Sequence, residues 1–206
     1  MMDGAPGSTM VDVAFTLTGQ RLPREHRRAL AEVLARRLPW LADEPAAGVH
    51  RINVASGAGP LALLSGRSRL TLRVPRGRIE ALAALVGLQI DFGEHTLTVG
   101  GGSHTRELLP HGTLYAHVVA AADDDETAFL AAVDAELAAL GVVARSICGR
   151  RQPIGDDASP RSGYSLMLDQ LSPESALCVL EHGIGPHRLW GCGLFVPHKS
   201  AAAVGH

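Results

Sequence analysis

Aromatic side chains are scarce in this chain, because 4 Phe, 2 Trp and 2 Tyr make up only 4% of its 206 residues. Many RNA-binding modules stack bases on a platform of aromatic side chains, and this composition argues against that class. Lysine is rarer still: Lys199 is the only one, so arginine provides nearly all of the positive charge. Because the guanidinium group binds phosphate through a planar fork of donors, this composition suits phosphate recognition better than a general solubilising surface.

The sequence also lacks the patterns of disulfide-rich, metal-binding and membrane-spanning proteins. Cys148, Cys178 and Cys192 have no paired spacing, so we expect reduced core or loop residues. Metal-dependent nucleases need clustered carboxylates, but the one tight acidic run, 123–126, precedes a predicted helix and is interpreted as its cap. No apolar run approaches the roughly 18 residues of a membrane span, and no signal peptide precedes Val11. We therefore expect a cytoplasmic protein without membrane, metal or cofactor.

Charge is distributed unevenly along the chain, although its net value is only -2. Residues 1–78 contain 12 Lys or Arg and 6 Asp or Glu, whereas the remainder contains 7 and 15. The first part is therefore basic, which favours an anionic partner.

Hydrophobic periodicity predicts two successive modules with a similar order of elements. In the first module, alternating apolar residues predict a strand at 11–18, and helical spacing predicts a helix from Leu22 to Leu38. Further strands are predicted at 49–54, 61–64 and 69–74, a second helix at 79–86, and strand segments within 88–99 that turn at Gly93. This order within roughly 90 residues is typical of a ferredoxin-like module.

The second module follows the glycines at 100–102, which predict a linker over 100–112. Strands are predicted at 113–121, 142–148, 164–168 and 194–196, with helices at 127–140 and from Ser172 to Glu181. We therefore predict an α+β protein with two tandem ferredoxin-like domains, 11–99 and 113–198, between a disordered lead at 1–10 and a tail at 199–206. A doubly wound parallel sheet is the alternative, and it requires longer strand-helix alternation without paired central strands.

The most specific motif is the glycine-rich segment 183–193. Two Gly-x-Gly pairs frame a short insert, and the residues of interest are Gly183, Gly185, His187, Arg188, Gly191 and Gly193. Glycines let backbone N–H groups approach an anion closely, and a guanidinium stands beside them, so the segment is interpreted as a phosphate-binding loop. The alternative is a glycine-rich turn before a terminal strand, since short glycine motifs also occur by chance.

Candidate acids and bases come from the 10 histidines, because imidazole titrates near neutral pH. His50 has a favourable context, since it precedes Arg51 at the entry to a predicted strand. His26 lies at the start of the arginine-rich helix and is the second candidate. Apart from His187, the others have weaker contexts: His95, His104, His111, His117, His182, His198 and His206.

Gly-x-Gly, five residues and Gly-x-Gly again, near the end of a chain of this length, resembles the glycine-rich loop of the CRISPR repeat-processing endoribonucleases, the sixth CRISPR-associated (Cas) family. The sequences Leu-Ser-Pro-Glu-Ser at 171–175 and Gly-Cys-Gly-Leu-Phe-Val-Pro-His at 191–198 resemble its myxobacterial-subtype branch. The resemblance implies two ferredoxin-like domains that bind CRISPR repeat RNA and cut it without metal, leaving a 2',3'-cyclic phosphate. The subunits of a CRISPR surveillance complex are further candidate partners.

The resemblance also implies where the catalytic histidine lies. In many members it is between the first helix and the second strand, a placement that His50 matches, and in others it is in the first helix, which retains His26. The tyrosine or lysine partners of some members have no clear match before Tyr115, so Arg51 or the second histidine would take that place. Four arginines are expected to flank a β-hairpin that holds the RNA backbone: Arg145, Arg150, Arg151 and Arg161.

Two other functions remain open on the sequence. The chain could be a non-catalytic RNA-binding subunit of a CRISPR effector complex, with tandem domains that hold a guide RNA. It could also be a small-molecule sensor or anion-binding enzyme that uses the glycine-rich segment for a nucleotide phosphate, although no nucleotide fingerprint is embedded in a strand-to-helix turn. We favour the metal-independent endoribonuclease.

Overall fold

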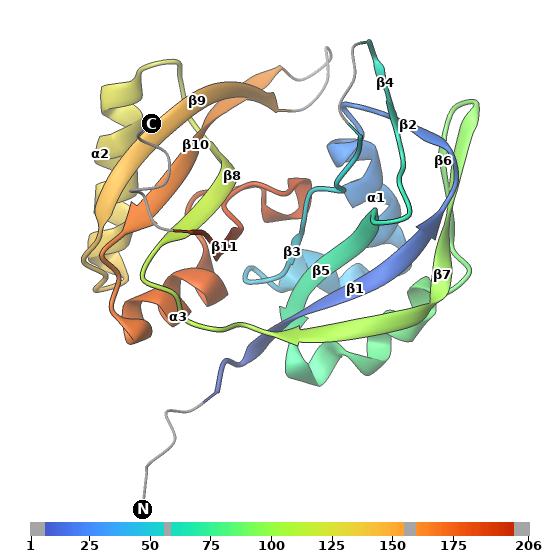
Figure 1. Cartoon of the computed structure of the whole chain (residues 1–206), viewed down its shortest axis with the longest axis horizontal. Coiled ribbons are helices and arrows are strands. Elements are labelled where there is room, and N and C mark those ends of the chain that lie inside the picture. The colour runs from blue at the N-terminus through green and yellow to red at the C-terminus, as the bar shows by residue number, and fades with distance from the viewer. Residues whose placement is uncertain (1–6, 56–58, 155–159, 200–206) are drawn as a thin grey trace, which may run out of the picture.

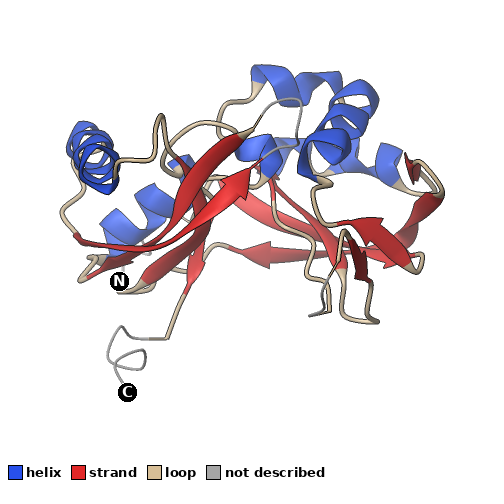
Figure 2. Cartoon of the chain, turned by 90° about the horizontal axis from the view of Figure 1, so that it is seen from above, coloured by secondary structure: helices blue, strands red, loops and turns tan. Residues whose placement is uncertain are grey.

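The computed structural model describes residues 7–55, 59–154 and 160–199, and these form an α+β fold around two antiparallel sheets (Figures 1 and 2). A five-stranded sheet has the order β3-β5-β1-β7-β6, and a four-stranded sheet has the order β11-β8-β10-β9. A separate two-stranded ribbon joins β2 and β4. Every strand pairing within the described residues is antiparallel, which rules out the doubly wound parallel sheet.

The five-stranded sheet contains β1 (Met10–Thr18), β3 (Gly48–Val49), β5 (Arg69–Pro75), β6 (Gln89–Phe92) and β7 (His95–Glu107). Strand β7 continues through the glycines that were predicted to form a linker, and it pairs with β1 as far as Glu107. A Cβ on Gly100 would lie 1.9 Å from Oγ1 of Thr16. The glycine therefore permits close packing in the sheet rather than flexibility.

The helical segments of the first half differ from the prediction at their ends. Residues Arg21–Pro23 form β2, which pairs with β4 (Leu61–Leu63), and α1 spans Arg27–Arg37. The predicted start at Leu22 was wrong because Pro23 disfavours a helical conformation in the residue before it. The predicted helix at 79–86 is a 3₁₀ helix, η3 (Glu80–Leu85), and the predicted strand at 49–54 is reduced to β3. Two shorter 3₁₀ segments are η1 (Pro39–Asp43) and η2 (Arg76–Arg78).

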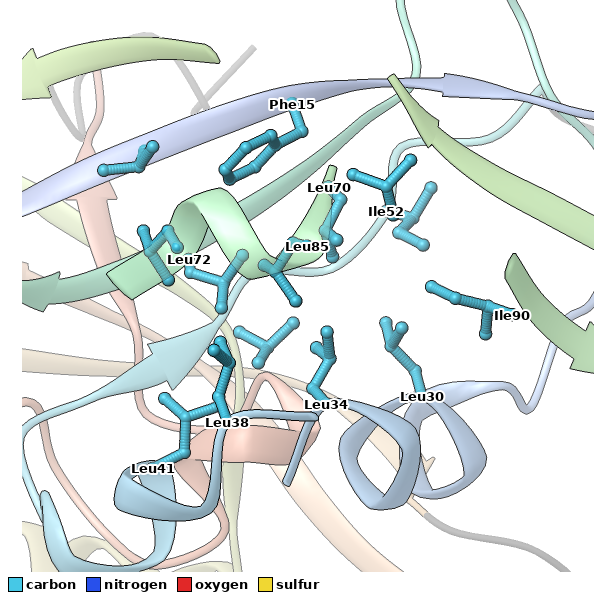
Figure 3. Close-up of a cluster of buried hydrophobic side chains, with 14 of the residues drawn as sticks. Phe15, Leu30, Leu34, Leu38, Leu41, Ile52, Leu70, Leu72, Leu85 and Ile90 are labelled. Atoms are coloured by element: carbon cyan, nitrogen blue, oxygen red, sulfur yellow. The ribbon is translucent and has the colours of Figure 1, made fainter. Parts of the chain in front are cut away.

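The core of the first half lies between one face of the five-stranded sheet and the helical segments. Phe15, Leu70 and Leu72 extend from the sheet toward Leu34 of α1 and Leu85 of η3 (Figure 3). These positions alternate along β1 and β5 with residues that point to the opposite face. That opposite face carries Asp12, Arg69, Thr71 and Arg73, and the pairing register places Asp12 directly across from Arg73.

The four-stranded sheet contains β8 (Leu114–Ala120), β9 (Arg145–Ile154), β10 (Arg161–Asp169) and β11 (Phe195–Pro197). Its helices are α2 (Glu126–Ala139), capped by the Asp125 side chain, and α3 (Pro173–His182), capped by Ser172. Both caps match the predicted helix starts. A second buried cluster, which includes Phe129, Leu166 and Phe195, packs between this sheet and its helices. Strands β9 and β10 extend beyond the predicted strands at 142–148 and 164–168 into the residues between them.

Part of the predicted lead at 1–10 is packed against the second half. The backbone N–H of Thr9 donates to Oε1 of Glu181 at 2.6 Å, and Met10 is buried in the second core cluster. Residues 1–6, like 200–206 of the predicted tail, lie outside the described residues. No described helix has both the length and the apolar character needed to cross a membrane.

Candidate active site

A cleft of about 410 Å³ lies between the outward faces of the two sheets. Strand alternation places two residues of β8 in the cleft, because Leu114, Ala116 and Val118 are buried while Tyr115 and His117, which alternate with them, line the opening. The charged and aromatic lining residues are Asp12, His50, Arg51, Arg67, Arg69, Arg106, Tyr115 and His117. The cleft is therefore rich in cations and suited to an anionic ligand. No described group of three or more His, Cys, Asp or Glu side chains is arranged to hold a metal ion.

His50 follows β3 directly and is fixed to the sheet by its backbone, whose N–H donates to the carbonyl of Thr71 at 2.8 Å. Its side chain is 15% exposed, and Nε2 lies 3.1 Å from Oδ1 of Asp12. Burial lowers the pKa of His50, and although Asp12 raises it, the nearby cations lower it further. The imidazole is therefore neutral near neutral pH and can accept a proton.

Asp12 joins His50 to a buried arginine. Arg73 donates from Nε to Oδ1 of Asp12 at 2.7 Å and from Nη2 to Oδ2 at 2.9 Å. Burial alone would raise the pKa of Asp12, but the hydrogen bonds and charges of His50 and Arg73 hold it well below its ordinary value. Asp12 is thus ionised across the neutral range.

Arg51 and His117 meet across the cleft from the two halves of the chain. Nη1 of Arg51 lies 2.7 Å from Nε2 of His117, and Nε2 of Gln152 donates to the His117 carbonyl at 2.7 Å. Burial, followed by the charges of Arg51 and Arg27, lowers the pKa of His117 to about 4. The neutral imidazole accepts the hydrogen bond and holds the guanidinium in the cleft. Sequence reasoning placed His117 among the weaker histidines, yet its position between the apolar residues of a predicted strand was a usable signal.

His26 occupies a neighbouring cavity of about 140 Å³, which shares Arg51 and His117 with the main cleft. The residue is only 4% exposed, and Nδ1 lies 2.8 Å from the carbonyl oxygen of Pro23. Burial lowers the pKa of His26. The ring thus lies beside the cleft with one nitrogen engaged by the turn before α1.

The four glycine N–H groups of the glycine-rich segment are not free for the predicted phosphate cradle. The N–H groups of its four framing glycines donate within the protein: Gly183 to Val179 O at 2.8 Å, Gly185 to Glu136 Oε2 at 2.7 Å, Gly191 to Arg188 O at 3.0 Å and Gly193 to Val118 O at 2.8 Å. Donors that are already bonded are not free to bind an anion. The glycines instead let the chain pack closely against itself. A Cβ on Gly191 would lie 3.1 Å from Val49 O and 3.5 Å from Arg51 N, so this glycine supports the segment that carries His50.

Arg188, predicted to bind phosphate, does not line the cleft. It begins η4 (Arg188–Trp190), is 8% exposed, and donates from Nη2 to Ala46 O at 2.8 Å and to Glu181 O at 3.2 Å. Nη1 also donates to the carbonyl of His182, the last residue of α3. The bonds to Glu181 and His182 satisfy carbonyls at the C-terminus of α3, where a cation is favourable. Burial and the charge of Arg73 lower the pKa of Arg188 to about 10.

The other predicted contacts also lie outside the cleft. His187 has a left-handed backbone with φ of 65° and stacks on Trp190 at 4.6 Å between ring centroids. Four exposed arginines lie on the β9–β10 hairpin: Arg145, Arg150, Arg151 and Arg161. Arg151 forms an ion pair with Asp124. The structure thus brings together His50, Arg51 and Gly191 among the predicted residues, and adds Asp12, Tyr115, His117, Arg67, Arg69 and Arg106 to them.

Comparisons with known proteins agree with the resemblance. The family model described as Cas6 CRISPR matches residues 11–200. The CRISPR-associated endonuclease Cas6 of Myxococcus xanthus (strain DK1622) is 36% identical over 196 residues, which cover 94% of this chain and 84% of that protein. A solved CRISPR-associated protein Cas6 has a TM-score of 0.62 at 11% identity, covering 93% of this chain and 100% of its own. A Cas6-related protein from Pyrococcus furiosus has a TM-score of 0.58 at 13% identity, covering 93% of this chain and 98% of its own. The family match and the bacterial relative show that the chain belongs to the Cas6 CRISPR family.

Proposed function

We propose that this chain is an endoribonuclease that binds CRISPR repeat RNA and cuts precursor crRNA into guide units. Family membership and the relative from Myxococcus xanthus, which is named an endonuclease, support this function. The observation that carries it is the position of a neutral histidine, His50, beside Arg51 in an arginine-lined cleft. A non-catalytic RNA-binding protein would not need a proton acceptor at that point.

We further propose that the two sheets and their helices are two tandem ferredoxin-like domains, the first extended from the predicted 99 to Glu107 at the end of β7 and the second at 113–198. Two separate buried clusters support this division, since one is built on the five-stranded sheet and the other on the four-stranded sheet. The likeness to solved Cas6 structures supports the same fold. RNA would then bind across the cleft between the domains.

The proposed reaction requires no metal. Neutral His50 takes the proton of the 2'-OH, the 2'-oxygen bonds to the adjacent phosphorus, and the P–O5' bond breaks. The departing 5'-oxygen takes up a proton from water, and the products carry a 2',3'-cyclic phosphate and a 5'-hydroxyl. Arg51, held by His117, would stabilise the negative charge that develops on the phosphoryl oxygens.

The proposed function predicts cleavage that depends on the 2'-OH and survives chelation. Purified protein incubated in EDTA with a labelled CRISPR repeat RNA should cut at one site, and the same RNA with a 2'-deoxy nucleotide there should remain intact, because the attacking oxygen is missing. Gel analysis with an end-group assay for cyclic phosphate provides the measurement. Tight binding of both RNAs without cleavage in EDTA or in added Mg²⁺ would instead favour a non-catalytic subunit.

We also propose that the exposed hairpin arginines hold the RNA backbone. Replacing Arg145, Arg150 and Arg161 together with glutamine should reduce the slope of log K against log salt by about 2, because each lost phosphate contact removes about 0.7–0.9 from it. Binding to the 2'-deoxy RNA at several salt concentrations measures the slope. Arg36→Gln, at an exposed position of α1, is the control. An unchanged slope in the triple variant would show that these arginines do not contact RNA.

A further inference from the structure

Asp12 stands in the middle of a hydrogen-bonded chain that runs from the cleft into the interior. Its side chain is 14% exposed and lies on β1 opposite Arg73 of β5. Oδ1 faces both Nε2 of His50, at 3.1 Å, and Nε of Arg73, at 2.7 Å, while Oδ2 accepts from Nη2 of Arg73 at 2.9 Å. The orientation of the carboxylate is therefore fixed by two N–H donors of the buried Arg73 guanidinium on one side and by the imidazole on the other.

This arrangement fixes the tautomer of His50. An ionised carboxylate can only accept hydrogen bonds, and a neutral imidazole carries a proton on one nitrogen alone. The contact between Oδ1 of Asp12 and Nε2 of His50 therefore requires the proton to be on Nε2. Nδ1 then carries the lone pair and is the atom that can accept a proton.

Arg73 is itself fixed by the second half of the chain. The side chain is 1% exposed, and Nη1 donates to the carbonyls of Leu180 at 2.8 Å and Phe195 at 3.0 Å. Leu180 belongs to the last turn of α3, and Phe195 begins β11, so both acceptors belong to the other half of the chain. The packing of the two halves thus determines where Asp12, and with it His50, is held.

We propose that Asp12 and Arg73 are positioning residues that hold His50 as the Nε2–H tautomer, so that Nδ1 is the base in RNA cleavage. The proposal rests on the proposed function, but the tautomer itself can be observed in the absence of RNA. A carboxylate that orients an imidazole and stabilises its protonated form is a known device of acid-base catalysis. Here the carboxylate belongs to the first half of the chain, and the second half fixes its orientation through the bonds from Arg73 to Leu180 and Phe195.

The proposal predicts a distinctive effect of Asp12→Asn, which keeps the size of the side chain and removes its charge. The amide can present N–H to His50, which would favour the opposite tautomer, so kcat should fall by about 10²-fold. Three charged groups act on the pKa of His50, namely Asp12, Arg73 and Arg188, and only Asp12 raises it. Cleavage requires neutral His50 and declines as pH falls through its pKa. Removing the carboxylate lowers that pKa further, so the acid limb of the rate profile should move to lower pH.

The experiment combines NMR and kinetics on the full chain. The ¹⁵N shifts of the His50 ring, assigned with His50→Gln, report the tautomer of the wild type and of Asp12→Asn. Single-turnover cleavage across pH gives the rates, and binding of the 2'-deoxy repeat RNA tests the RNA site. Asp43→Asn, an exposed carboxylate in η1, is the matched control and should behave as the wild type.

A wild-type His50 with its proton on Nε2, together with a changed tautomer, a slower rate and a shifted acid limb in Asp12→Asn, supports the proposal. A proton on Nδ1 in the wild type would overturn it, and this measurement decides the matter even if the variant does not fold. An equal loss of rate at every pH with an unchanged tautomer would also overturn it, because it would show a merely structural role. A wild type that has the expected tautomer but does not cut RNA would refute the proposed function and leave the positioning of His50 supported.

Discussion

Replacement of His50 by alanine should reduce the rate of RNA cleavage by about 10²- to 10⁴-fold, the range expected when a positioned proton acceptor is removed. The affinity for RNA should change little, because the arginines of the cleft remain in place. Single-turnover cleavage and binding of a 2'-deoxy repeat RNA separate the two effects. A variant that binds and cuts as well as the wild type would remove His50 from the catalytic site.

Two further histidines make this test specific. His95→Ala, at the β6–β7 turn, is the control for loss of an imidazole and should leave cleavage unchanged. His26→Ala should act mainly on stability, since the ring is buried and one nitrogen contacts the Pro23 carbonyl. A folded His26→Ala protein that has lost cleavage, beside a fully active His50→Ala protein, would move the catalytic role to His26.

The outline of the fold could be predicted because its elements are encoded locally. Alternation of apolar residues in 11–18 and the cap at Ser172 each depend on neighbouring residues alone. Errors occurred where a long-range contact decides the conformation. The glycines at 100–102 are typical of a linker, but pairing with β1 makes them part of a strand. The 3₁₀ conformation of η3 has no evident signal in its sequence.

The site was predictable to a smaller extent for the same reason. His50 and Arg51 are adjacent in sequence, so one pattern indicates both. The Arg51–His117 contact joins residues 66 positions apart, and the Asp12–Arg73 pair joins residues 61 apart. A guanidinium beside glycines looks the same in sequence whether it binds a phosphate or the end of a helix. Only the position of α3 shows that Arg188 binds the end of a helix.

The close packing of the glycine-rich segment predicts a second large effect, which concerns the stability of the fold rather than the chemistry of the site. Gly193→Ala should lower the free energy of unfolding by about 2–5 kcal/mol, the sum of about 1–2 kcal/mol for a left-handed backbone and about 1–3 kcal/mol for overpacking. Its φ is +65°, and a Cβ there would lie 1.9 Å from the carbonyl oxygen of Ile184. That obstacle is backbone, so no side chain can rotate away to relieve it.

Gly141 offers a matched control, because its φ is +67° but a Cβ would meet nothing within 4 Å. Gly141→Ala should therefore cost only about 1–2 kcal/mol, the backbone contribution alone. Urea denaturation of both variants, followed by circular dichroism, measures the difference. Equal losses would mean that the glycine at 193 is needed for its backbone conformation only. A larger loss at 193 would mean that this position is glycine because the segment packs against the backbone of its own chain at Ile184.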